Sequence, residues 1–272
     1  MKHLTVSVVI TTKNESEVLE NLLRSLLNQS HRPFEILLVD NNSKDRTKEI
    51  ASKYTDRIFN KGPERSAQRN FGAKKATGEA LLFLDADMEL ERDVLTQCVE
   101  EMQDPKVGGV IIPEISFGKS FWSRVKSYER SFYIGDESIE AARFFRRDMF
   151  FSAGGFDEEI TGPEDWELSD RVRRYFSISR IKNHILHNEG SLGFFELMKK
   201  KYYYGKKTPV YLRKAQQRTA LSSKTLFFLR KSFYKHPKQI VAQPVLFCAM
   251  IVMLTSELFS GVVGVIAGFF ND

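Results

Sequence analysis

Two carboxylates one residue apart, Asp85 and Asp87, directly follow the apolar run at residues 81–84. A short apolar run bounded by polar residues is typical of a buried strand in a parallel sheet. Ligands of such sheets bind beyond the carboxyl ends of the strands, where these aspartates would lie. A divalent cation that prefers oxygen uses one or two carboxylates and takes its other ligands from phosphate and water. The pair is therefore a candidate metal and phosphate site, although an isolated D-x-D is more often a solvated turn.

Polar loops also follow two earlier predicted strands. The β-branched strand at residues 5–10 runs into a loop at 11–15, and the strand at 34–39 ends at Asp40. Since the carboxyl ends of parallel strands meet at one edge of a sheet, these loops and residues 85–87 would open on the same edge. The sequence predicts one shared site there.

Helical segments separate these strands. Leucines at 19, 22, 23, 26 and 27 form one face of an amphipathic helix, and further helices are expected before residue 54, before residue 78 and at 91–102. This alternation predicts an α/β fold with a mostly parallel sheet flanked by helices. No G-x-G-x-x-G follows the first strand and no G-x-x-x-x-G-K-[ST] occurs. A dinucleotide-binding or P-loop protein is therefore disfavoured.

The second half offers a further carboxylate pair and a histidine. Pro163 places residues 164–165, Glu and Asp, at the front of a helix whose inner face is expected to carry Leu168, Val172 and Tyr175. Acidic residues in a first turn also compensate the helix dipole, which is the structural alternative. A strand is expected at 177–187 with His187 near its end, as a structural histidine or as a ligand.

The bulk composition indicates a folded protein with a local basic surface. The 272 residues include 41 Lys and Arg against 35 Asp and Glu, a net charge of +6, and residues 199–238 are rich in Lys and Arg with few acids. Cys98 and Cys248 lie far apart, which suggests a reducing compartment. Residues 7–12 already read as core, so no cleavable signal is expected before them.

The last part of the chain is strongly apolar. From residue 240 to 270 the sequence holds one formal charge, Glu257, and the stretch is long enough to cross a bilayer. Because Pro244 and several glycines interrupt it, we consider one tilted span, or two shorter helices that lie in the interface or re-enter it. A buried hairpin of a soluble domain is the alternative. The basic flank at 230–238 predicts that the preceding domain is cytoplasmic.

Lysines and tyrosines interleave at residues 197–207, a pattern that could bind nucleic acid. The apolar segment that follows favours a membrane surface instead, so no nucleic-acid partner is expected. We predict three regions: a catalytic domain at 1–210, a basic juxtamembrane linker at 211–238 and a hydrophobic membrane-associated tail at 239–272.

Five segments between residues 6 and 175 resemble, in order, the motifs of inverting family 2 glycosyltransferases with the GT-A fold. They read VVITTKNE, LLVDNNSKDRT, ERSAQRNFGA, LLFLDADMEL and GGFDEEITGPEDWEL. The resemblance implies a Rossmann-like GT-A sheet and a nucleotide diphosphate sugar as donor. It implies Mg²⁺ or Mn²⁺, whose charge would stabilise the leaving diphosphate.

The resemblance also implies roles for single residues. Family members contact the base and ribose at positions that correspond here to Thr12, Glu15, Asp40 and Arg65. Asp85 would face the ribose or a metal-bound water, and Asp87 would ligate the metal. Asp165 corresponds to the catalytic base, and His187 to a further metal ligand of some relatives.

The chain departs from the family pattern in two places. Lys13 stands where a tyrosine is often found, and residues 216–219 read QQRT, without the tryptophan of the Q-x-x-R-W motif of processive synthases. This favours transfer of a single sugar. With the apolar tail, it suggests a lipid-linked acceptor, such as a polyprenyl phosphate or a lipid-borne oligosaccharide, at the bilayer surface.

Two other function classes stay open. A sugar-phosphate nucleotidyltransferase uses a similar sheet but usually opens with a Gly-rich loop bearing Arg and Lys, which residues 11–15 lack. A non-catalytic, membrane-bound protein that binds sugar nucleotides would not need the acids at 40, 85, 87 and 165 together.

Overall fold

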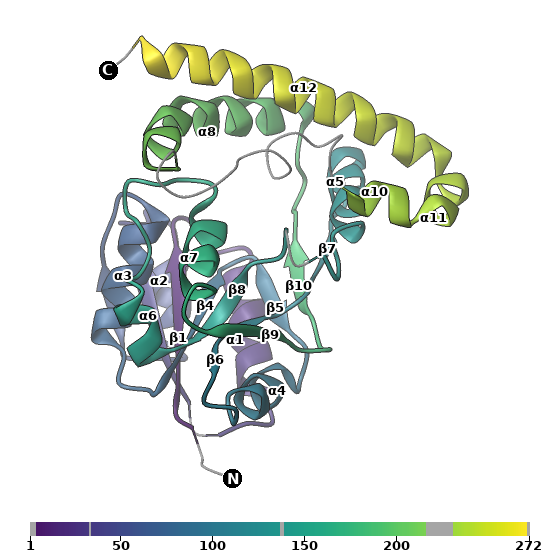
Figure 1. The fold of residues 1–272 in the computed structure, drawn as a ribbon. Helices are drawn as coiled ribbons and strands as arrows, with labels where there is room; N and C mark the ends of the chain where they lie inside the picture. Colours follow the sequence, from purple (N-terminus) through teal and green to yellow (C-terminus); the bar gives the residue numbers. More distant parts are fainter. Residues whose placement is uncertain (1–3, 33, 137–138, 216–230, 271–272) are drawn as a thin grey trace. The chain divides into compact units, whose positions relative to one another are not determined.

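The computed structural model describes residues 4–32, 34–136, 139–215 and 231–270. The chain divides into two units, a sheet unit and a helical unit. The sheet unit comprises Met1–Glu114, Ala141–Glu158 and Pro163–His187. The helical unit comprises Ile115–Glu140, Glu159–Gly162 and Asn188–Asp272. Figure 1 shows the elements of each.

A mixed sheet of seven strands forms the centre of the sheet unit, in the order β3-β2-β1-β4-β8-β6-β9. The first part contributes β1 (Val6–Thr12), α1 (Leu19–Leu27), β2 (Phe34–Asp40), α2 (Thr47–Ala51), β3 (Ile58–Asn60), α3 (Arg65–Lys75), β4 (Ala80–Asp85), β5 (Met88–Leu90), α4 (Val94–Glu101) and β6 (Val107–Ile111). The later part contributes β8 (Ala142–Arg146), α6 (Arg147–Ser152), α7 (Glu164–Val172), β9 (Ser177–Arg180) and β10 (Ile185–Asn188).

The parallel strands predicted from the sequence form one half of this sheet. β1 pairs in parallel with β2 on one side and with β4 on the other, and β2 pairs in parallel with β3. β8 then pairs antiparallel with β4 and with β6. The sheet is therefore mostly parallel, as expected, with an antiparallel strand inserted between β4 and β6.

Helices cover both faces of the sheet. In β1, Val8 and Ile10 pack with the leucines of α1 and with α4, whereas Val9 packs on the opposite side. In β4 the same alternation directs Leu82 to the first core and Phe83 to the second, which α3, α6 and α7 complete. Because successive side chains of a strand point to opposite faces, a strand buried on both faces reads as the continuous apolar run seen in the sequence.

Two details of the predicted second half are wrong. Tyr175 is 77% exposed, whereas Leu168 and Val172 are fully buried as expected. Helix α7 ends at Val172, so Tyr175 lies beyond the last helical turn and does not share its inner face. The strand expected at 177–187 is two strands: β9 pairs with β6 of the large sheet, and β10 pairs antiparallel with β5. The chain changes sheets between them, which a continuous alternating pattern does not reveal.

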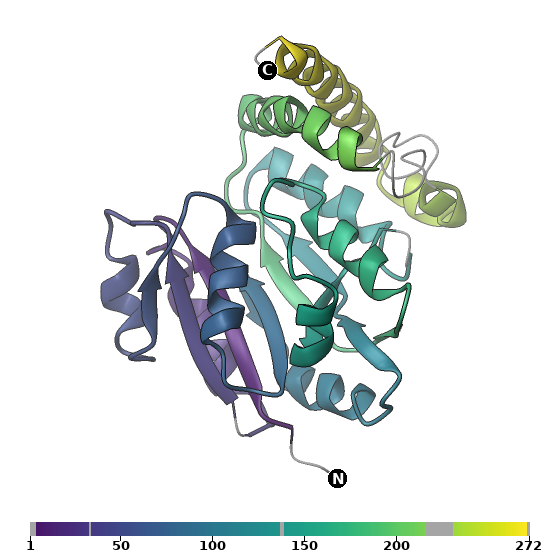
Figure 2. The same cartoon turned by 60° about the vertical axis from the view of Figure 1, so that its left-hand side comes forward.

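The described residues of the helical unit form several helices and, from Ile115 on, a short strand. Its elements are β7 (Glu114–Phe117), α5 (Phe121–Ser131), α8 (Phe194–Ala215), α10 (Lys231–Lys235), α11 (Pro237–Ala242) and α12 (Pro244–Phe269). Helices α8 and α12 lie side by side in both views of the molecule (Figures 1 and 2), and α5 also packs against α12. A core that includes Val125, Leu197, Met250 and Leu254 holds these three helices together.

The apolar C-terminal stretch forms one long helix and a short one. Pro244 begins α12 at its first turn, where a proline is tolerated, and the helix continues through its glycines for 26 residues. Within the described residues, α12 is the one helix long and apolar enough to cross a membrane. The length and composition of α12 also fit a core helix of a soluble protein. Its contacts with neighbouring helices are therefore needed to distinguish the two roles.

Candidate active site

The register of the sheet brings three predicted strand ends together. Thr12 of β1 pairs with Asp40 of β2, and Thr11 of β1 pairs with Asp85 of β4. The threonine side chains connect these ends: Thr11 Oγ1 donates to Asp85 Oδ1 at 3.1 Å, and Thr12 Oγ1 donates to Asp40 Oδ1 at 2.8 Å. Asp40 and Asp85 therefore flank the end of β1 at one edge of the sheet.

Asp40 shapes the loops beside this edge. Its side chain is fully buried, and it accepts hydrogen bonds from the backbone N–H of Ser43 at 2.7 Å and from the Ser43 hydroxyl at 2.5 Å. The Ser43 hydroxyl in turn accepts from the backbone N–H of Asn14, whose φ of 59° bends the loop after β1. Gln68 donates to the backbone carbonyls of Val39 and Thr12 at 2.7 and 3.2 Å, which joins the ends of β1 and β2 to α3.

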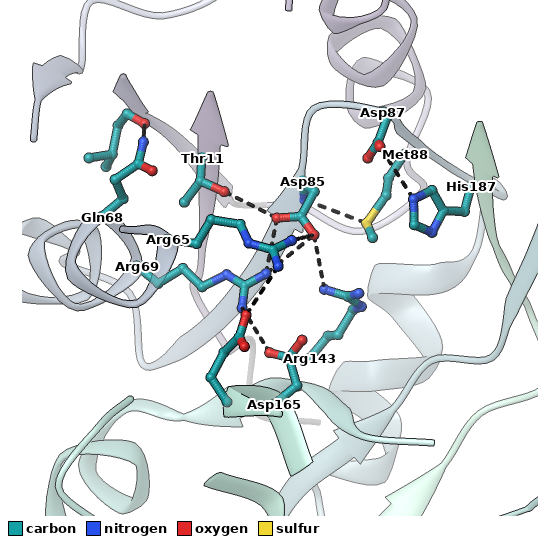
Figure 3. Close-up of polar contacts among 12 residues, drawn as sticks. Thr11, Arg65, Gln68, Arg69, Asp85, Asp87, Met88, Arg143, Asp165 and His187 are labelled. Atoms are coloured by element: carbon teal, nitrogen blue, oxygen red, sulfur yellow. Dashed lines mark hydrogen bonds and ion pairs between the residues drawn. The ribbon is translucent and has the colours of Figure 1, made fainter. Parts of the chain in front are cut away.

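Arg69 of α3 connects the end of β4 to the start of α7. Its fully buried guanidinium donates from Nη1 to Asp165 Oδ1 at 2.8 Å and from Nη2 to Asp85 Oδ1 at 3.0 Å (Figure 3). Glu164 Oε1 lies 3.6 Å from Nη1. Asp85 and the adjacent pair Glu164 and Asp165, from two distant parts of the chain, are thus gathered around one cation. A buried charge of this kind is tolerated because it is paired.

Two more arginines face Asp85. Arg65 Nη1 lies 3.6 Å and Arg143 Nη1 lies 3.8 Å from Asp85 Oδ2. Burial by itself would raise the pKa of Asp85, but Arg69, Arg65 and Arg143 outweigh it and hold that pKa well below its usual range. Asp85 is therefore a carboxylate at any physiological pH.

The neighbouring acids Glu15 and Asp87 are not neutralised by arginines in the way that Asp85 is. The pKa of Glu15 is raised from 4.5 to about 7, by burial first and then by the charges of Asp87 and Asp85. Among the described residues, no arginine or lysine forms an ion pair with Glu15 or Asp87. The site thus has an arginine-neutralised part around Asp85 and Asp165, and an electronegative part around Glu15 and Asp87.

His187 of β10 lies beside Asp87, because β10 pairs with β5, the strand that follows Asp87. Its Nε2 is 3.3 Å from Asp87 Oδ2, and its Nδ1 is 3.2 Å from Glu114 Oε2. The other oxygen of Glu114 accepts from Arg143 Nε at 2.5 Å. A carboxylate on one ring nitrogen fixes the orientation of a histidine and leaves the other nitrogen directed at its partner.

These residues fit a divalent cation. Asp87 Oδ1 is buried and accepts no hydrogen bond in the described part of the chain, Asp87 Oδ2 faces His187 Nε2, and Glu15 adds negative charge nearby. Within the described residues no three His, Cys, Asp or Glu side chains already form a metal cluster. The Asp87 carboxylate suits a cation such as Mg²⁺ or Mn²⁺ that takes its remaining ligands from substrate phosphates and water, and the His187 imidazole would add one nitrogen ligand.

Most residues singled out in the sequence lie in this one region, namely Glu15, Arg65, Asp85, Asp87, Asp165 and His187, with Thr12 and Asp40 beside it. Sequence reasoning missed Gln68, Arg69, Glu114 and Arg143. Arg69 could have been found, since it follows Arg65 by four residues on a helix and so shares its face. Residues 216–219, used above to argue against processivity, lie outside the described residues.

Comparisons with known proteins match most of this chain. The family model described as "Glycosyl transferase family 2" matches residues 7–203. A beta-monoglucosyldiacylglycerol synthase of Trichormus variabilis is 30% identical over 194 residues, which cover 61% of this chain and 41% of the relative. A GalNAc(5)-diNAcBac-PP-undecaprenol beta-1,3-glucosyltransferase of Campylobacter jejuni is 32% identical over 204 residues, 65% of this chain and 64% of the relative. The chain thus spans less than two thirds of either relative.

A solved structure shares the fold. The mannosyltransferase PcManGT from Pyrobaculum calidifontis, in complex with GDP-Man and Mn²⁺, superimposes with a TM-score of 0.63 at 16% identity, covering 98% of this chain and 87% of that chain. At this identity the likeness concerns the fold alone.

Proposed function

Because this chain belongs to glycosyl transferase family 2 and is a glycosyltransferase, we propose that it moves one sugar from a nucleotide diphosphate sugar to an acceptor hydroxyl with inversion at the anomeric carbon. The observation that carries this proposal is the position of Arg69. Its guanidinium joins Asp165 at the start of α7 to Asp85 at the end of β4, so the proposed base faces the strand edge where the donor would bind.

We assign the donor to the edge formed by β1, β2 and β4. Glu15, Arg65 and Asp85 are the proposed contacts to the base and ribose, together with Thr12. Asp40 belongs to the same proposed set, and its complete burial favours a supporting role in which it holds Thr12 and the Ser43 turn in place. Thr11 and Arg69 would keep the Asp85 carboxylate aimed at this edge.

The cation is proposed to bind at Asp87, with His187 as a second protein ligand. When bound, Mg²⁺ or Mn²⁺ neutralises charge on the leaving diphosphate. Glu114 would hold the His187 ring through Nδ1, and Glu15 would add to the negative potential that attracts the ion. A relative in fold carries GDP-Man and Mn²⁺, which supports metal dependence here.

Asp165 is the proposed catalytic base. An acceptor hydroxyl that transfers its proton to Asp165 becomes a stronger nucleophile and attacks the anomeric carbon from the side opposite the diphosphate. One displacement of this kind inverts the configuration. The ion pair with Arg69 would orient the carboxylate for this step, so Arg69 is a positioning residue in our account.

The acceptor is proposed to be lipid-linked and the enzyme to work at the cytoplasmic face of a membrane. Two relatives are named for lipid-linked compounds: one is a synthase of beta-monoglucosyldiacylglycerol, and the other is a glucosyltransferase that acts on GalNAc(5)-diNAcBac-PP-undecaprenol. The apolar helix α12 and the lysines of α8 suit such a location. We keep the division into a catalytic domain at 1–210, a basic linker at 211–238 and a membrane-associated tail at 239–272 as part of this proposal.

A thermal-shift panel of nucleotide sugars, with and without Mn²⁺, tests the donor assignment. A ligand that binds the folded state alone raises the melting temperature, so the true donor should stand out and should need the metal. The stabilising donor is then offered to detergent-solubilised lipid extract and to water-soluble sugars. Transfer to the lipid fraction supports the acceptor class, and transfer to soluble sugars alone overturns it. Diphosphate release from a nucleoside triphosphate would instead favour a nucleotidyltransferase.

A further inference from the structure

Helix α12 has two apolar sides, and the fold covers one of them. Its buried positions lie on one side of the helix: Met250, Met253, Leu254, Glu257, Gly264 and Gly268. On the opposite side, eight exposed positions recur every three or four residues: Val245, Cys248, Val252, Thr255, Phe259, Val262, Ile266 and Phe269. At 1.5 Å per residue, this exposed stripe is about 36 Å long and almost wholly apolar.

The buried side of α12 is fixed to α8 by close backbone contact. A Cβ added to Gly264 would lie 2.3 Å from the carbonyl oxygen of Tyr202, and a Cβ added to Gly205 would lie 2.3 Å from the carbonyl oxygen of Gly261. Farther along, a Cβ on Gly268 would meet the backbone of Lys206. The two helices therefore approach backbone to backbone over more than one turn. Figures 1 and 2 show them side by side.

Glu257, halfway along α12, adds charged contacts. Its buried carboxylate lies 3.2 Å from Lys126 Nζ of α5 and 3.2 Å from Lys201 Nζ of α8. Lys126 also pairs with Glu129 at 2.6 Å. Removing one partner of a buried pair leaves an uncompensated charge, so α12 is held as a part of the helical unit along its middle.

These contacts argue against α12 as a membrane span. If α12 crossed the hydrocarbon core, α8 would have to enter with it, together with the exposed Lys199, Lys200, Lys206 and Lys207. Charged side chains exposed to lipid at that depth are costly. A helix that lies in the plane of the interface avoids this cost, because its apolar stripe enters the acyl boundary while neighbouring lysines stay at the headgroups.

We propose that α12 lies flat on an anionic phospholipid bilayer, with its exposed stripe as the membrane-binding face. The lysines of α8, with Lys235 and Lys238 before α12, supply the positive charge that anionic headgroups attract. Tyr202, Tyr203 and Tyr234 are exposed near them and are suited to the interface. The proposal rests on the proposed function insofar as that function names a membrane, and it specifies how the chain binds it.

Depth measurement distinguishes a flat helix from a span. Cys248 is exposed on the stripe and Cys98 is buried, so the native thiol can carry a bimane label near the start of α12. Phe259→Cys and Phe269→Cys in a Cys248→Ser background place the same label at the middle and the end. Quenching by phospholipids with doxyl groups at different depths should place all three at one shallow level. A graded depth from one end of α12 to the other would overturn the proposal.

Binding measurement tests the stripe itself. Phe259, 72% exposed, and Val262 are changed together to glutamate, while Leu27 of α1, 51% exposed, gives the control variant Leu27→Glu. In flotation with vesicles containing phosphatidylglycerol, the double variant should lose about tenfold or more in binding, because two apolar side chains leave the acyl boundary. Leu27→Glu should bind as the wild type does. The proposal would be overturned if the wild type, the double variant and Leu27→Glu bound vesicles equally well. It would also be overturned if the wild type self-associated and did not bind vesicles.

Donor binding separates this proposal from the proposed function. The metal-dependent thermal shift should be the same in the double variant and in the wild type. A wild-type protein that keeps this shift but does not bind vesicles contradicts the flat membrane helix and leaves the transferase assignment intact. A protein that binds vesicles at equal label depth but gives no shift with any nucleotide sugar contradicts the proposed function alone.

Discussion

At the scale of single residues, the site depends on a balance between arginines and carboxylates. Arg69 is fully buried and contacts Asp85, Glu164 and Asp165. Burying an isolated charge would be costly, and here each charged group offsets the desolvation cost of the others. Burial and the charge of Asp165 raise the pKa of Glu164, whereas Arg65 and Arg69 act in the opposite direction.

Replacing Arg69 should therefore destabilise the protein. Arg69→Met leaves Asp85 and Asp165 close together without their shared cation, and we expect a loss of about 3–5 kcal/mol in the free energy of unfolding, measured with urea. Arg24→Met is the control, since Arg24 forms an exposed pair with Glu20 one turn away, and such pairs contribute well under about 1 kcal/mol. Equal stability of both variants would contradict the central role of Arg69.

Asp165 should be needed for turnover and not for folding. Asp165→Asn keeps the hydrogen bond acceptor for Arg69 but cannot take up a proton, so kcat should fall by about 10²–10⁴. The metal-dependent thermal shift with the donor should persist. Asp170→Asn, on the same helix and half exposed, is the matched control and should retain activity. If Asp165→Asn turned over at the wild-type rate, the assignment of the base would be wrong.

Glu15 gives the site a pH dependence in metal-free protein. Its folded-state pKa is raised from 4.5 to about 7, so its contribution to stability is complete below pH 4.5 and is lost as the pH rises to 7. The melting temperature of the wild type should therefore fall relative to that of Glu15→Gln between pH 5 and 8. Glu17→Gln, two residues away and exposed, should follow the wild type. If the melting temperatures of the wild type and of Glu15→Gln changed in the same way between pH 5 and 8, this prediction would be wrong.

Residue types and spacing in the sequence predicted the acidic residues of the site better than the residues that contact them. Asp85 and Asp87 were recognisable because they directly follow an apolar strand. Pro163 placed Asp165 at a helix start, and the family resemblance singled it out as the base. Arg143 and Glu114 come from strands distant in the sequence, and they meet Asp85 and His187 through sheet pairing. No local pattern encodes such contacts, since they depend on which strands become neighbours.

At the scale of elements, glycines determine how closely α8 and α12 approach. An alanine at Gly264 would place its Cβ 2.3 Å from the Tyr202 carbonyl oxygen, so the helices would have to separate. We expect Gly264→Ala to destabilise the helical unit by about 1–3 kcal/mol. Thermal unfolding followed by circular dichroism measures this change.

Gly261 provides the control one turn earlier on the same helix. A Cβ there meets nothing within 4 Å. Because alanine is favoured over glycine inside a helix by about 1 kcal/mol, Gly261→Ala should be neutral or stabilising. Equal effects of the two alanines would show that α8 and α12 are not packed as described.

Elements with a strong hydrophobic periodicity were predictable from the sequence, whereas changes of pairing partner between strands were not. The strands up to β4 and the buried leucines of α1 follow directly from apolar runs and amphipathic spacing. Leu27, which was expected on the same face of α1, is instead 51% exposed at the end of the helix. The antiparallel insertion of β8 and the division of residues 177–187 into β9 and β10 depend on long-range pairing. Pro244 was taken as an interruption of the apolar tail, whereas it begins α12.

At the scale of the whole molecule, the two units carry different parts of the proposed activity. The sheet unit holds the charged site at the ends of its parallel strands. The helical unit presents an apolar stripe and a set of lysines suited to a bilayer. A transferase with a soluble donor and a lipid-linked acceptor needs both capacities, since its substrates come from water and from the membrane.

The most direct test of this account is calorimetric titration of the donor selected by thermal shift into wild-type protein and Asp87→Asn, with and without Mn²⁺. The exposed Asp56 supplies the control Asp56→Asn. If Asp87 holds the cation against the diphosphate, Mn²⁺ should tighten donor binding at least about tenfold in the wild type and in Asp56→Asn, and should have little effect in Asp87→Asn. Donor binding of the wild type that is equally tight with and without metal would contradict the account.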